Sequence, residues 1–331
     1  MHFKRADIER ALKEIENAQK VVIITHRSPD GDAIGSSLGF AKALENWGKE
    51  VTVVIPDAYA SVFNYLEGNI LDHSENTVGA EDAIRSADLL FCLDHNDLKR
   101  VGNVREVVDK AIVTKILIDH HPYPSNEFDI MFSSTSYGST AEMVFHFLDD
   151  LDSLHLINEE GATALMTGII TDTGSFKYGT SAITFSVASQ LVGKGAKSED
   201  IQKAIFDQNT ISRLRLNGYA LSEKLEILED INAAIISLNG DELERFNFQK
   251  GDTEGLVNQA LSIKGIKMAV FVQDRNGETR LSFRSQDDIE VNKIATENFN
   301  GGGHDRAAGG ISELSVEETV SKLKEILPNY A

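Results

Sequence analysis

Hydrophobic residues in the first half of the chain alternate between strand-like and helix-like patterns. Short apolar runs rich in β-branched residues predict buried strands at Val21–Thr25, Val51–Ile55, Asp88–Leu93 and Lys115–Ile118. Apolar residues at helical spacing predict helices over 4–18, 35–47, 140–148 and 158–170. Strands that alternate with helices favour an α/β fold, in which a mostly parallel sheet carries helices on both faces.

The pattern changes beyond residue 180, where helical segments dominate until about residue 225. Strands then follow at Ala233–Leu238, Met268–Gln273 and Thr279–Arg284, and helices are expected over 290–298 and 315–326. A chain of 331 residues is long enough for two domains with separate cores. We therefore predict a first domain over 1–185, a helical connecting region over 186–228 and a smaller α+β domain over 229–331.

The composition of the chain indicates in which cellular compartment the protein is found and which partners it can bind. The formal net charge of −20 repels long nucleic acids, although a small anionic substrate remains compatible with it. The single cysteine, Cys92, lies in an apolar run and suits a reducing compartment. The charged N-terminus lacks a signal-peptide core, and no apolar run approaches the ~20 residues of a membrane span. We expect a soluble, cytoplasmic protein without a membrane partner.

Acidic and imidazole side chains follow the predicted strands of the first domain. Because the carboxyl ends of parallel strands meet at one edge of a sheet, these side chains are expected to lie close together. They are His26, Asp30 and Asp32 after the first strand, Asp94 after the third, and Asp119, His120 and His121 after the fourth. Asp172 follows a predicted helix and is a further candidate for the same edge.

Each of these segments has an ordinary interpretation by itself, since Pro-Asp-Gly-Asp is a common turn and a single Asp often caps a helix. Together, four carboxylates in one pocket repel one another unless cations compensate. Two divalent ions would neutralise Asp30, Asp32, Asp94 and Asp172. Oxygen and imidazole donors without thiolate favour Mn²⁺ or Mg²⁺, with Co²⁺ or Zn²⁺ as alternatives. Two such ions, about 3.5–4 Å apart, activate water and neutralise a phosphoryl oxygen, which indicates hydrolytic phosphoryl transfer.

Five segments in order resemble the motifs of one enzyme superfamily. They are HRSPDGDAIGS at 26–36, LDHND with Arg100 at 93–100, Asp-His-His at 119–121, TGIITDTGSF at 167–176 and GGGHDRAAGG at 301–310. The chain resembles the DHH phosphoesterase superfamily, and within it the nanoRNase/pAp phosphatase subfamily. The resemblance implies an N-terminal catalytic domain followed by a DHH-associated substrate-binding domain.

The resemblance also implies roles for individual residues. One metal ion would be held by His26, Asp30 and Asp94, and the other by Asp32, His120 and Asp172, with Asp94 bridging both. Asp119 would orient an imidazole, although a helix or turn cap is an alternative. His121 would act beside the scissile phosphate as leaving-group acid or charge stabiliser, with packing under the site as the alternative.

Substrate recognition is expected in the second domain. The backbone N–H groups of Gly301, Gly302 and Gly303 can approach a phosphate closely, and His304 follows this glycine turn. Arg284 can contact a phosphate through two N–H groups, and Ser285 lies next to it. Two further candidates have plain alternatives: Arg306 as a solvent-facing side chain, and Arg100 as half of a surface salt bridge.

The implied activity is hydrolysis of short oligoribonucleotides and of 3′-phosphoadenosine 5′-phosphate, as an exoribonuclease and phosphatase that releases mononucleotides or phosphate. The implied cofactors are two divalent ions, Mn²⁺ first, with Mg²⁺ or Co²⁺ as alternatives. A phosphodiesterase of linear or cyclic dinucleotides would have the same metal centre. A non-catalytic nucleotide-binding module would have lost metal positions, and none is lost. The resemblance further implies a homodimer formed through the catalytic domain.

Overall fold

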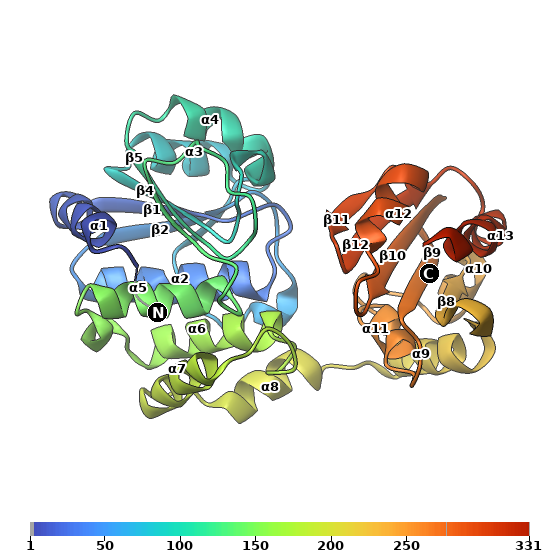
Figure 1. Cartoon of the computed structure of the whole chain (residues 1–331). Coiled ribbons are helices and arrows are strands. Elements are labelled where there is room, and N and C mark those ends of the chain that lie inside the picture. Colours follow the sequence, from blue (N-terminus) through green and yellow to red (C-terminus); the bar gives the residue numbers. More distant parts are fainter. Residues whose placement is uncertain (1–2, 276, 331) are drawn as a thin grey trace. The chain divides into compact units, whose positions relative to one another are not determined.

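The computed structural model of the protein describes residues 3–275 and 277–330, which form two compact units (Figure 1). The first unit ends at Gln208 and the second begins at Asn209. The helices of the predicted connecting region are therefore divided between the units. Helices α7 (Ala182–Gly193) and α8 (Ser198–Phe206) belong to the first, and α9 (Ile211–Glu223) belongs to the second.

The first unit is built on a six-stranded sheet in which every pair of neighbouring strands is parallel. Its strands are β1 (Lys20–Ile24), β2 (Glu50–Ile55), β3 (Ile70–Asp72), β4 (Leu89–Leu93), β5 (Thr114–Asp119) and β6 (Ile130–Ser133). The spatial order is β3-β2-β1-β4-β5-β6. The two edge strands, β3 and β6, are absent from the sequence prediction because they are too short to show a pattern.

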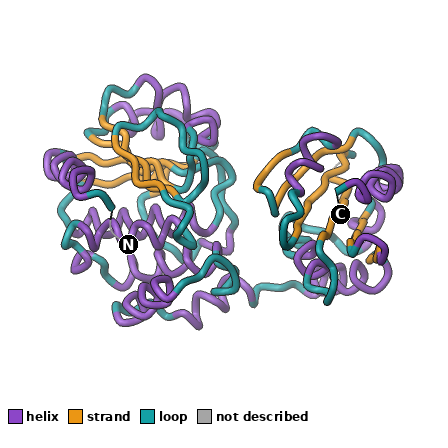
Figure 2. Tube along the Cα trace, viewed as in Figure 1, coloured by secondary structure: helices purple, strands orange, loops and turns teal. Residues whose placement is uncertain are grey.

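Helices cover both faces of this sheet, shown in orange in Figure 2, which confirms the predicted α/β class. One face packs on α1 (Arg5–Asn17), α2 (Gly31–Asn46), α5 (Thr140–Asp150) and α6 (Glu159–Asp172), and the other on α3 (Thr77–Arg85) and α4 (Arg105–Lys110). Strand residues alternate between the two cores, as Phe91 and Cys92 do. Burial raises the pKa of the Cys92 thiol to about 12, so Cys92 is an unreactive core residue.

The strand order places a topological switch point between β1 and β4. The chain leaves β1 toward β2 on one side, and β4 then pairs with β1 on the other. In parallel α/β sheets, ligands bind in the crevice at the carboxyl ends of the strands that flank such a point. The residues that follow β1, β4 and β5 are those that carry the predicted chemistry.

Helix α2 begins at Gly31, four residues before the predicted start at 35, because Asp30 caps it. The Asp30 carboxylate accepts hydrogen bonds from the N–H groups of Asp32 at 3.0 Å and Ala33 at 3.1 Å. Helices α2 and α6 approach so closely that a Cβ on Gly35 would lie 2.5 Å from the carbonyl oxygen of Ala164. This backbone-to-backbone packing fixes the first turn of α2 beside α6.

The second unit contains a mixed six-stranded sheet in the order β11-β12-β10-β9-β8-β7. Its strands are β7 (Leu225–Leu228), β8 (Ala233–Leu238), β9 (Met268–Arg275), β10 (Glu278–Ser285), β11 (Gly302–His304) and β12 (Ala307–Ser312). The helices are α9, α10 (Gly240–Arg245), α11 (Leu256–Leu261), α12 (Val291–Asn298) and α13 (Val316–Ile326). Among the strand pairs of the described residues in this unit, only β8 and β9 are parallel, so the unit is α+β, as predicted.

The glycine-rich segment, predicted as a turn, instead includes strand β11, which forms a hairpin with β12. A Cβ on Gly301 would lie 2.1 Å from the carbonyl oxygen of Gly309. Gly303 has a φ of +141°, and a Cβ there would lie 2.5 Å from the carbonyl oxygen of Ala307. These two glycines allow β11 to approach β12, whereas Gly302 faces open space.

Short 3₁₀ helices complete the chain, at Ser61–Phe63, Leu98–Val104, Leu154–Leu156, Glu229–Ile231 and Leu327–Asn329. Among the helices of the described residues, none combines the length and the apolar character that crossing a membrane would require.

Candidate metal centre

The six residues predicted as metal ligands meet at the carboxyl edge of the first sheet. They form two groups in which the ligand atoms all lie within 4.8 Å of one another. One group is His26, Asp30 and Asp94, and the other is Asp32, His120 and Asp172. This is the division that the sequence motifs imply.

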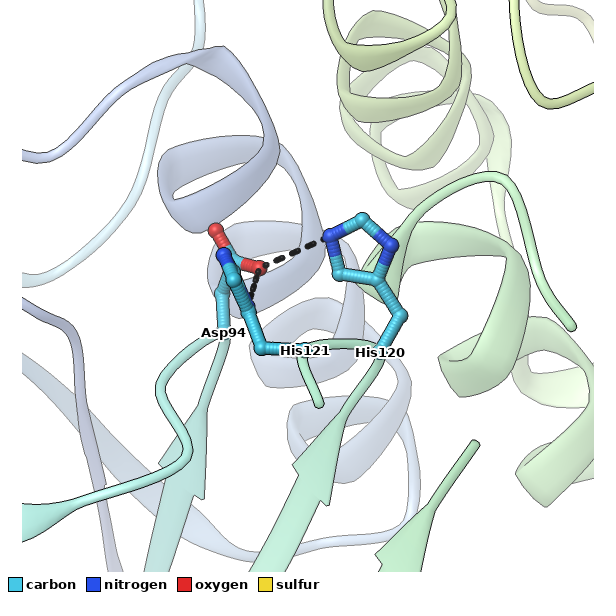
Figure 3. Close-up of side chains that lie close together, drawn as sticks. All are labelled: Asp94, His120 and His121. Carbon is cyan, nitrogen blue, oxygen red and sulfur yellow. Dashed lines mark ion pairs between the residues drawn. The ribbon is translucent and has the colours of Figure 1, made fainter. Parts of the chain in front are cut away.

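Asp94 faces both groups with different oxygens. Its Oδ2 lies 3.4 Å from His26 Nε2, and its Oδ1 lies 3.7 Å from His120 Nε2. In Figure 3, dashed lines join one oxygen of its carboxylate to both His120 and His121. Asp94 adopts a left-handed φ of +63°, which is strained for a residue with a Cβ and is concentrated at functional sites in proteins. A carboxylate placed in this way can be shared by two cations.

One ring nitrogen of His26 is buried in this site without a hydrogen-bond partner. Its Nδ1 lies 2.8 Å from the carbonyl oxygen of Arg27, which can only accept, so Nδ1 carries the proton. Nε2 is buried and has no hydrogen-bond partner. Burial would lower the pKa of His26, but the negative charge of the Asp94 carboxylate, whose Oδ2 lies 3.4 Å from Nε2, outweighs burial and raises that pKa. A cation would take the place of the proton that Nε2 otherwise attracts.

The carboxylates also carry more negative charge than their surroundings compensate. Burial, followed by the charges of Asp94 and Asp172, raises the pKa of Asp32 well above its usual range. Burial also raises the pKa of Asp172 to about 6, and Asp94 and Asp30 add to that rise. His120 Nε2 lies 3.4 Å from Asp172 Oδ2. These donors therefore fit a pair of divalent cations, which would neutralise the cluster.

Asp30 combines two roles that the sequence presented as alternatives. Its Oδ1 caps α2, as a single Asp before a helix often does, and Gly31 and Asp32 are already helical rather than part of a turn. The same side chain is 61% exposed and belongs to the His26 group. Since each carboxylate oxygen has two lone pairs, a helix cap leaves acceptor capacity for a cation.

Asp119 orients His121. Asp119 is fully buried at the end of β5, where its Oδ2 accepts the backbone N–H of His121 at 3.1 Å and its Oδ1 lies 2.7 Å from His121 Nδ1. Asp94, His120 and His121 also form a ligand-like group, but the Nδ1–H of His121 donates a hydrogen bond to Asp119 Oδ1. Burial would lower the pKa of His121, but Asp119 and Asp94 outweigh it and raise that pKa. This arrangement favours His121 as a proton-bearing group beside the cations.

His95, next to Asp94 in the sequence, stands apart from this site. It is fully buried, and its Nδ1 lies 2.8 Å from the carbonyl oxygen of Leu93. Burial lowers its pKa to about 3, so it stays neutral. It belongs to none of the three ligand groups found among the described residues.

The N-terminus of α5 supplies contacts that the motifs did not reveal. The N–H groups of Thr140 and Ala141 donate to the two Asp32 oxygens at 2.6 Å and 2.9 Å. The Thr140 hydroxyl donates to Asp94 Oδ1 at 2.8 Å. The sequence Ser-Thr-Ala-Glu before an apolar run is a recognisable helix start, but its approach to Asp32 and Asp94 depends on the tertiary fold.

In the same unit, Arg100 lies in the 3₁₀ helix Leu98–Val104, and its carbonyl oxygen accepts the N–H of Arg27 at 2.8 Å. Its positive charge acts against the rise in the pKa of His121.

In the second unit the candidates lie on two faces of the sheet. Arg284 is opposite Ala307, which in turn is opposite His304, so Arg284 and His304 share a face. Arg306 is exposed in the β11–β12 turn. Ser285 points to the other face, where its hydroxyl donates to the carbonyl oxygen of Ile289 at 2.6 Å. The structure therefore separates Ser285 from the other candidates.

Comparison with protein families accounts for both units. Residues 20–169 match the DHH family, N-terminal domain, and residues 230–329 match the DHHA1 domain. The chain belongs to the DHH family. The metal centre described above lies in the DHH domain, apart from Asp172 just beyond its matched range, and the Arg284–His304 face lies in the DHHA1 domain.

Relatives in this family carry two kinds of name. The chain is 32% identical to "Cyclic-di-AMP phosphodiesterase GdpP" of Bacillus subtilis, over 98% of this chain and 50% of that protein. It is 25% identical to "Bifunctional oligoribonuclease and PAP phosphatase NrnA" of Bacillus subtilis, over 90% of this chain and 91% of that protein. It is 28% identical to the protein of the same name from Thermus thermophilus, over 96% of this chain and 91% of that protein. The chain thus spans about half the length of the GdpP relative. Both kinds of name describe phosphoesterases.

Solved structures agree with the two-unit DHH architecture. An exopolyphosphatase-related protein from Bacteroides fragilis has a TM-score of 0.96 and 38% identity, over 99% of this chain and 97% of that one. The exonuclease RecJ bound to manganese has a TM-score of 0.54 and 14% identity, over 97% of this chain and 92% of that one. The likeness to RecJ establishes a shared fold only.

Proposed function

We propose that this chain hydrolyses short oligoribonucleotides and 3′-phosphoadenosine 5′-phosphate with two divalent cations. The observation that carries the proposal is the position of Asp94, whose two oxygens face His26 and His120 in separate ligand groups. Relatives named oligoribonuclease and PAP phosphatase, matched over 91% of their length, support this substrate class.

The donor set is made of carboxylate oxygens and imidazole nitrogens, which favours Mn²⁺, with Mg²⁺ or Co²⁺ as alternatives. In this proposal His26, Asp30 and Asp94 hold one ion, and Asp32, His120 and Asp172 hold the other with Asp94 shared. When bound, the ions supply Lewis acidity and an activated water at neutral pH.

The chain's own side chains then orient the reaction. Asp119 holds the proton of His121 on Nδ1 and fixes the plane of the ring. His121 is the candidate for protonating the leaving oxygen or stabilising the charge that develops on it. The N-terminus of α5 keeps the Asp32 and Asp94 carboxylates in place through hydrogen bonds from Thr140 and Ala141.

In the DHHA1 domain we propose that Arg284, His304 and the exposed backbone at Gly302 bind a phosphate of the substrate, with Arg306 at the rim. Arg284 and His304 share one face of the sheet, and Gly302 has no neighbour within 4 Å of a Cβ position. A guanidinium and exposed backbone N–H groups together suit a phosphate. Gly301 and Gly303 support this phosphate site indirectly, because they allow the β11–β12 hairpin to form. Ser285 supports it through the hydrogen bond from its hydroxyl to the carbonyl oxygen of Ile289.

The test is hydrolysis of a dinucleotide, a long single-stranded RNA and phosphoadenosine phosphate, each with Mn²⁺, followed by product analysis. We expect the highest kcat/KM for the dinucleotide and phosphoadenosine phosphate, and no turnover by Asp94→Asn on any substrate. A preference for the long strand would contradict the proposal for short substrates, and activity of Asp94→Asn would contradict the shared-ligand assignment.

A second candidate is hydrolysis of cyclic or linear dinucleotides, because the chain is 32% identical to a cyclic-di-AMP phosphodiesterase over 98% of its own length. The same metal centre serves both reactions. Cyclic di-AMP and its linear form therefore belong in the panel, and a kcat/KM for cyclic di-AMP above that for the dinucleotide would favour this candidate.

A further inference from the structure

The segment that follows Asp172 adopts an unusual backbone. Gly174, Ser175 and Phe176 have consecutive left-handed φ values of +57°, +61° and +65°. For Ser175 and Phe176 this conformation is strained, and for a bulky residue such as Phe it is a genuine outlier. The strain is held by specific bonds: Ser175 N–H donates to Ile170 O at 2.7 Å, and Phe176 N–H donates to Thr173 Oγ1 at 2.9 Å.

Three aromatic side chains lie on this turn and on the following helix α7, and we call them the aromatic surface: half-buried Phe176, and exposed Tyr178 and Phe185. The rings of Phe176 and Phe185 are stacked, with centroids 5.4 Å apart and an interplanar angle of 23°. Phe185 is 55% exposed and Tyr178 is 52% exposed. Lys177 Nζ lies 5.1 Å from the centroid of the Tyr178 ring. Exposed aromatic rings grouped in this way are typical of binding sites.

The aromatic surface borders the metal centre. Phe176 is four residues beyond Asp172, and its N–H is bonded to Thr173, the next residue after that ligand. The same turn packs against the loop that enters α5, since a Cβ on Gly138 would lie 2.7 Å from the carbonyl oxygen of Gly179. That loop leads directly to Thr140, which bonds Asp32 and Asp94. The turn that carries Phe176 and Tyr178 is therefore connected, along the chain and by packing, to residues of the metal centre.

We propose that the aromatic surface binds a nucleobase of the substrate by stacking, which rests on the proposed nucleotide hydrolysis. Base–aromatic stacking is tolerant of sequence because every base has a π-face. Lys177 places a positive charge beside the Tyr178 ring, which suits the phosphate attached to the base because the chain as a whole carries a net charge of −20. Helix α7, which carries Phe185, contains no charged residue from Ala182 to Gly193. No charged side chain of this helix would therefore have to be displaced for a base to stack on Phe185.

The first experiment compares a dinucleotide with an analogue in which one base is replaced by hydrogen. For the wild type, we expect the base to lower KM by about 5- to 150-fold, the range for one stacked base. In Phe185→Ala and Tyr178→Ala that ratio of KM values should fall toward one, whereas Phe185→Trp should preserve it. Ile112→Ala is the matched control, since Ile112 is fully exposed in the same unit but precedes the amino end of β5, at the opposite edge of the sheet.

A second measurement separates failure of the aromatic surface from failure of the proposed activity. AMP and ribose 5-phosphate are titrated into the wild type and Phe185→Ala in the absence of turnover. Stacking is supported if the wild type binds AMP more tightly than ribose 5-phosphate and Phe185→Ala does not. This result supports stacking even if dinucleotides are not hydrolysed. An unchanged KM ratio together with equal AMP affinity overturns the proposal. A change of sedimentation coefficient in Phe185→Ala with unchanged AMP affinity also overturns it, because the rings would then contact a second protein chain.

Discussion

The Thr140 hydroxyl donates a hydrogen bond of 2.8 Å to Asp94 Oδ1, while the N–H of the same residue donates to Asp32 Oδ2 at 2.6 Å. One residue at the start of α5 therefore bonds a carboxylate from each ligand group. The N-terminus of a helix also carries a partial positive charge, which stabilises nearby carboxylates. This relationship holds the two carboxylates close together although they repel each other.

We predict that Thr140→Val weakens metal binding about 10- to 100-fold, the usual effect of removing a group that orients a ligand. Valine has nearly the shape of threonine and keeps the N–H bond to Asp32, so only the bond to Asp94 is lost. Isothermal titration calorimetry with Mn²⁺ measures the affinity. Thr140→Ser restores the hydroxyl and is expected to restore the affinity, and an equal loss in both variants would assign the effect to packing.

Asp119→Asn is expected to lower kcat about 10- to 100-fold while metal affinity stays near that of the wild type. Both Asp119 oxygens accept N–H groups of His121, and an amide can accept only one of them. The imidazole would then lose its fixed orientation although the ligand groups remain intact. Parallel measurement of kcat and Mn²⁺ affinity checks this, and an affinity loss as large as the kcat loss would make Asp119 part of the metal site instead.

The sequence was sufficient to predict the central strands and the site at their ends. Strands β1, β4 and β5 are nearly continuous apolar runs, which is typical of strands covered on both faces. The residues that follow them are polar, so the carboxyl edge of the sheet could be recognised without coordinates.

Other features depend on contacts between distant residues and have no local signal. Thr140 bonds Asp32, which is 108 residues away. The hairpin of β11 and β12 requires glycine because backbone atoms meet there, which a run of glycines does not distinguish from a flexible turn. Adjacency in the sequence places Ser285 beside Arg284, although adjacent residues in a strand point to opposite faces of the sheet.

The stability of the second unit should depend on pH through Glu242. Its carboxylate accepts the Tyr219 hydroxyl at 2.7 Å, Lys224 Nζ at 2.8 Å and the Asn239 N–H at 2.9 Å. Burial would raise the pKa of Glu242, but Lys224, Asn239 and Tyr219 together outweigh it and lower that pKa. A lowered carboxyl pKa contributes stability above the unfolded pKa of about 4.3, and that stability is lost as pH falls through the folded pKa.

We therefore expect Glu242→Gln to lower the free energy of unfolding by about 1–2 kcal/mol at neutral pH, and the difference from the wild type to shrink below about pH 4.5. Calorimetry is the suitable measurement because the single tryptophan, Trp47, reports only on the first unit. A difference that stays constant between pH 7 and pH 3 would mean that shape, rather than charge, explains the effect.

Gly302→Ala and Gly301→Ala separate binding from folding in the glycine-rich segment. Gly302 faces open space, so an added methyl should leave the unfolding free energy within about 0.5 kcal/mol of the wild type. If the backbone there approaches a phosphate, the methyl would obstruct it and raise KM about tenfold, which corresponds to about 1.4 kcal/mol. A Cβ on Gly301 would overlap the carbonyl oxygen of Gly309, so Gly301→Ala should cost about 1–3 kcal/mol of stability in the second unit. Calorimetry and steady-state kinetics on both variants provide the comparison, and a Gly302→Ala protein with wild-type KM would remove this strand from the phosphate site.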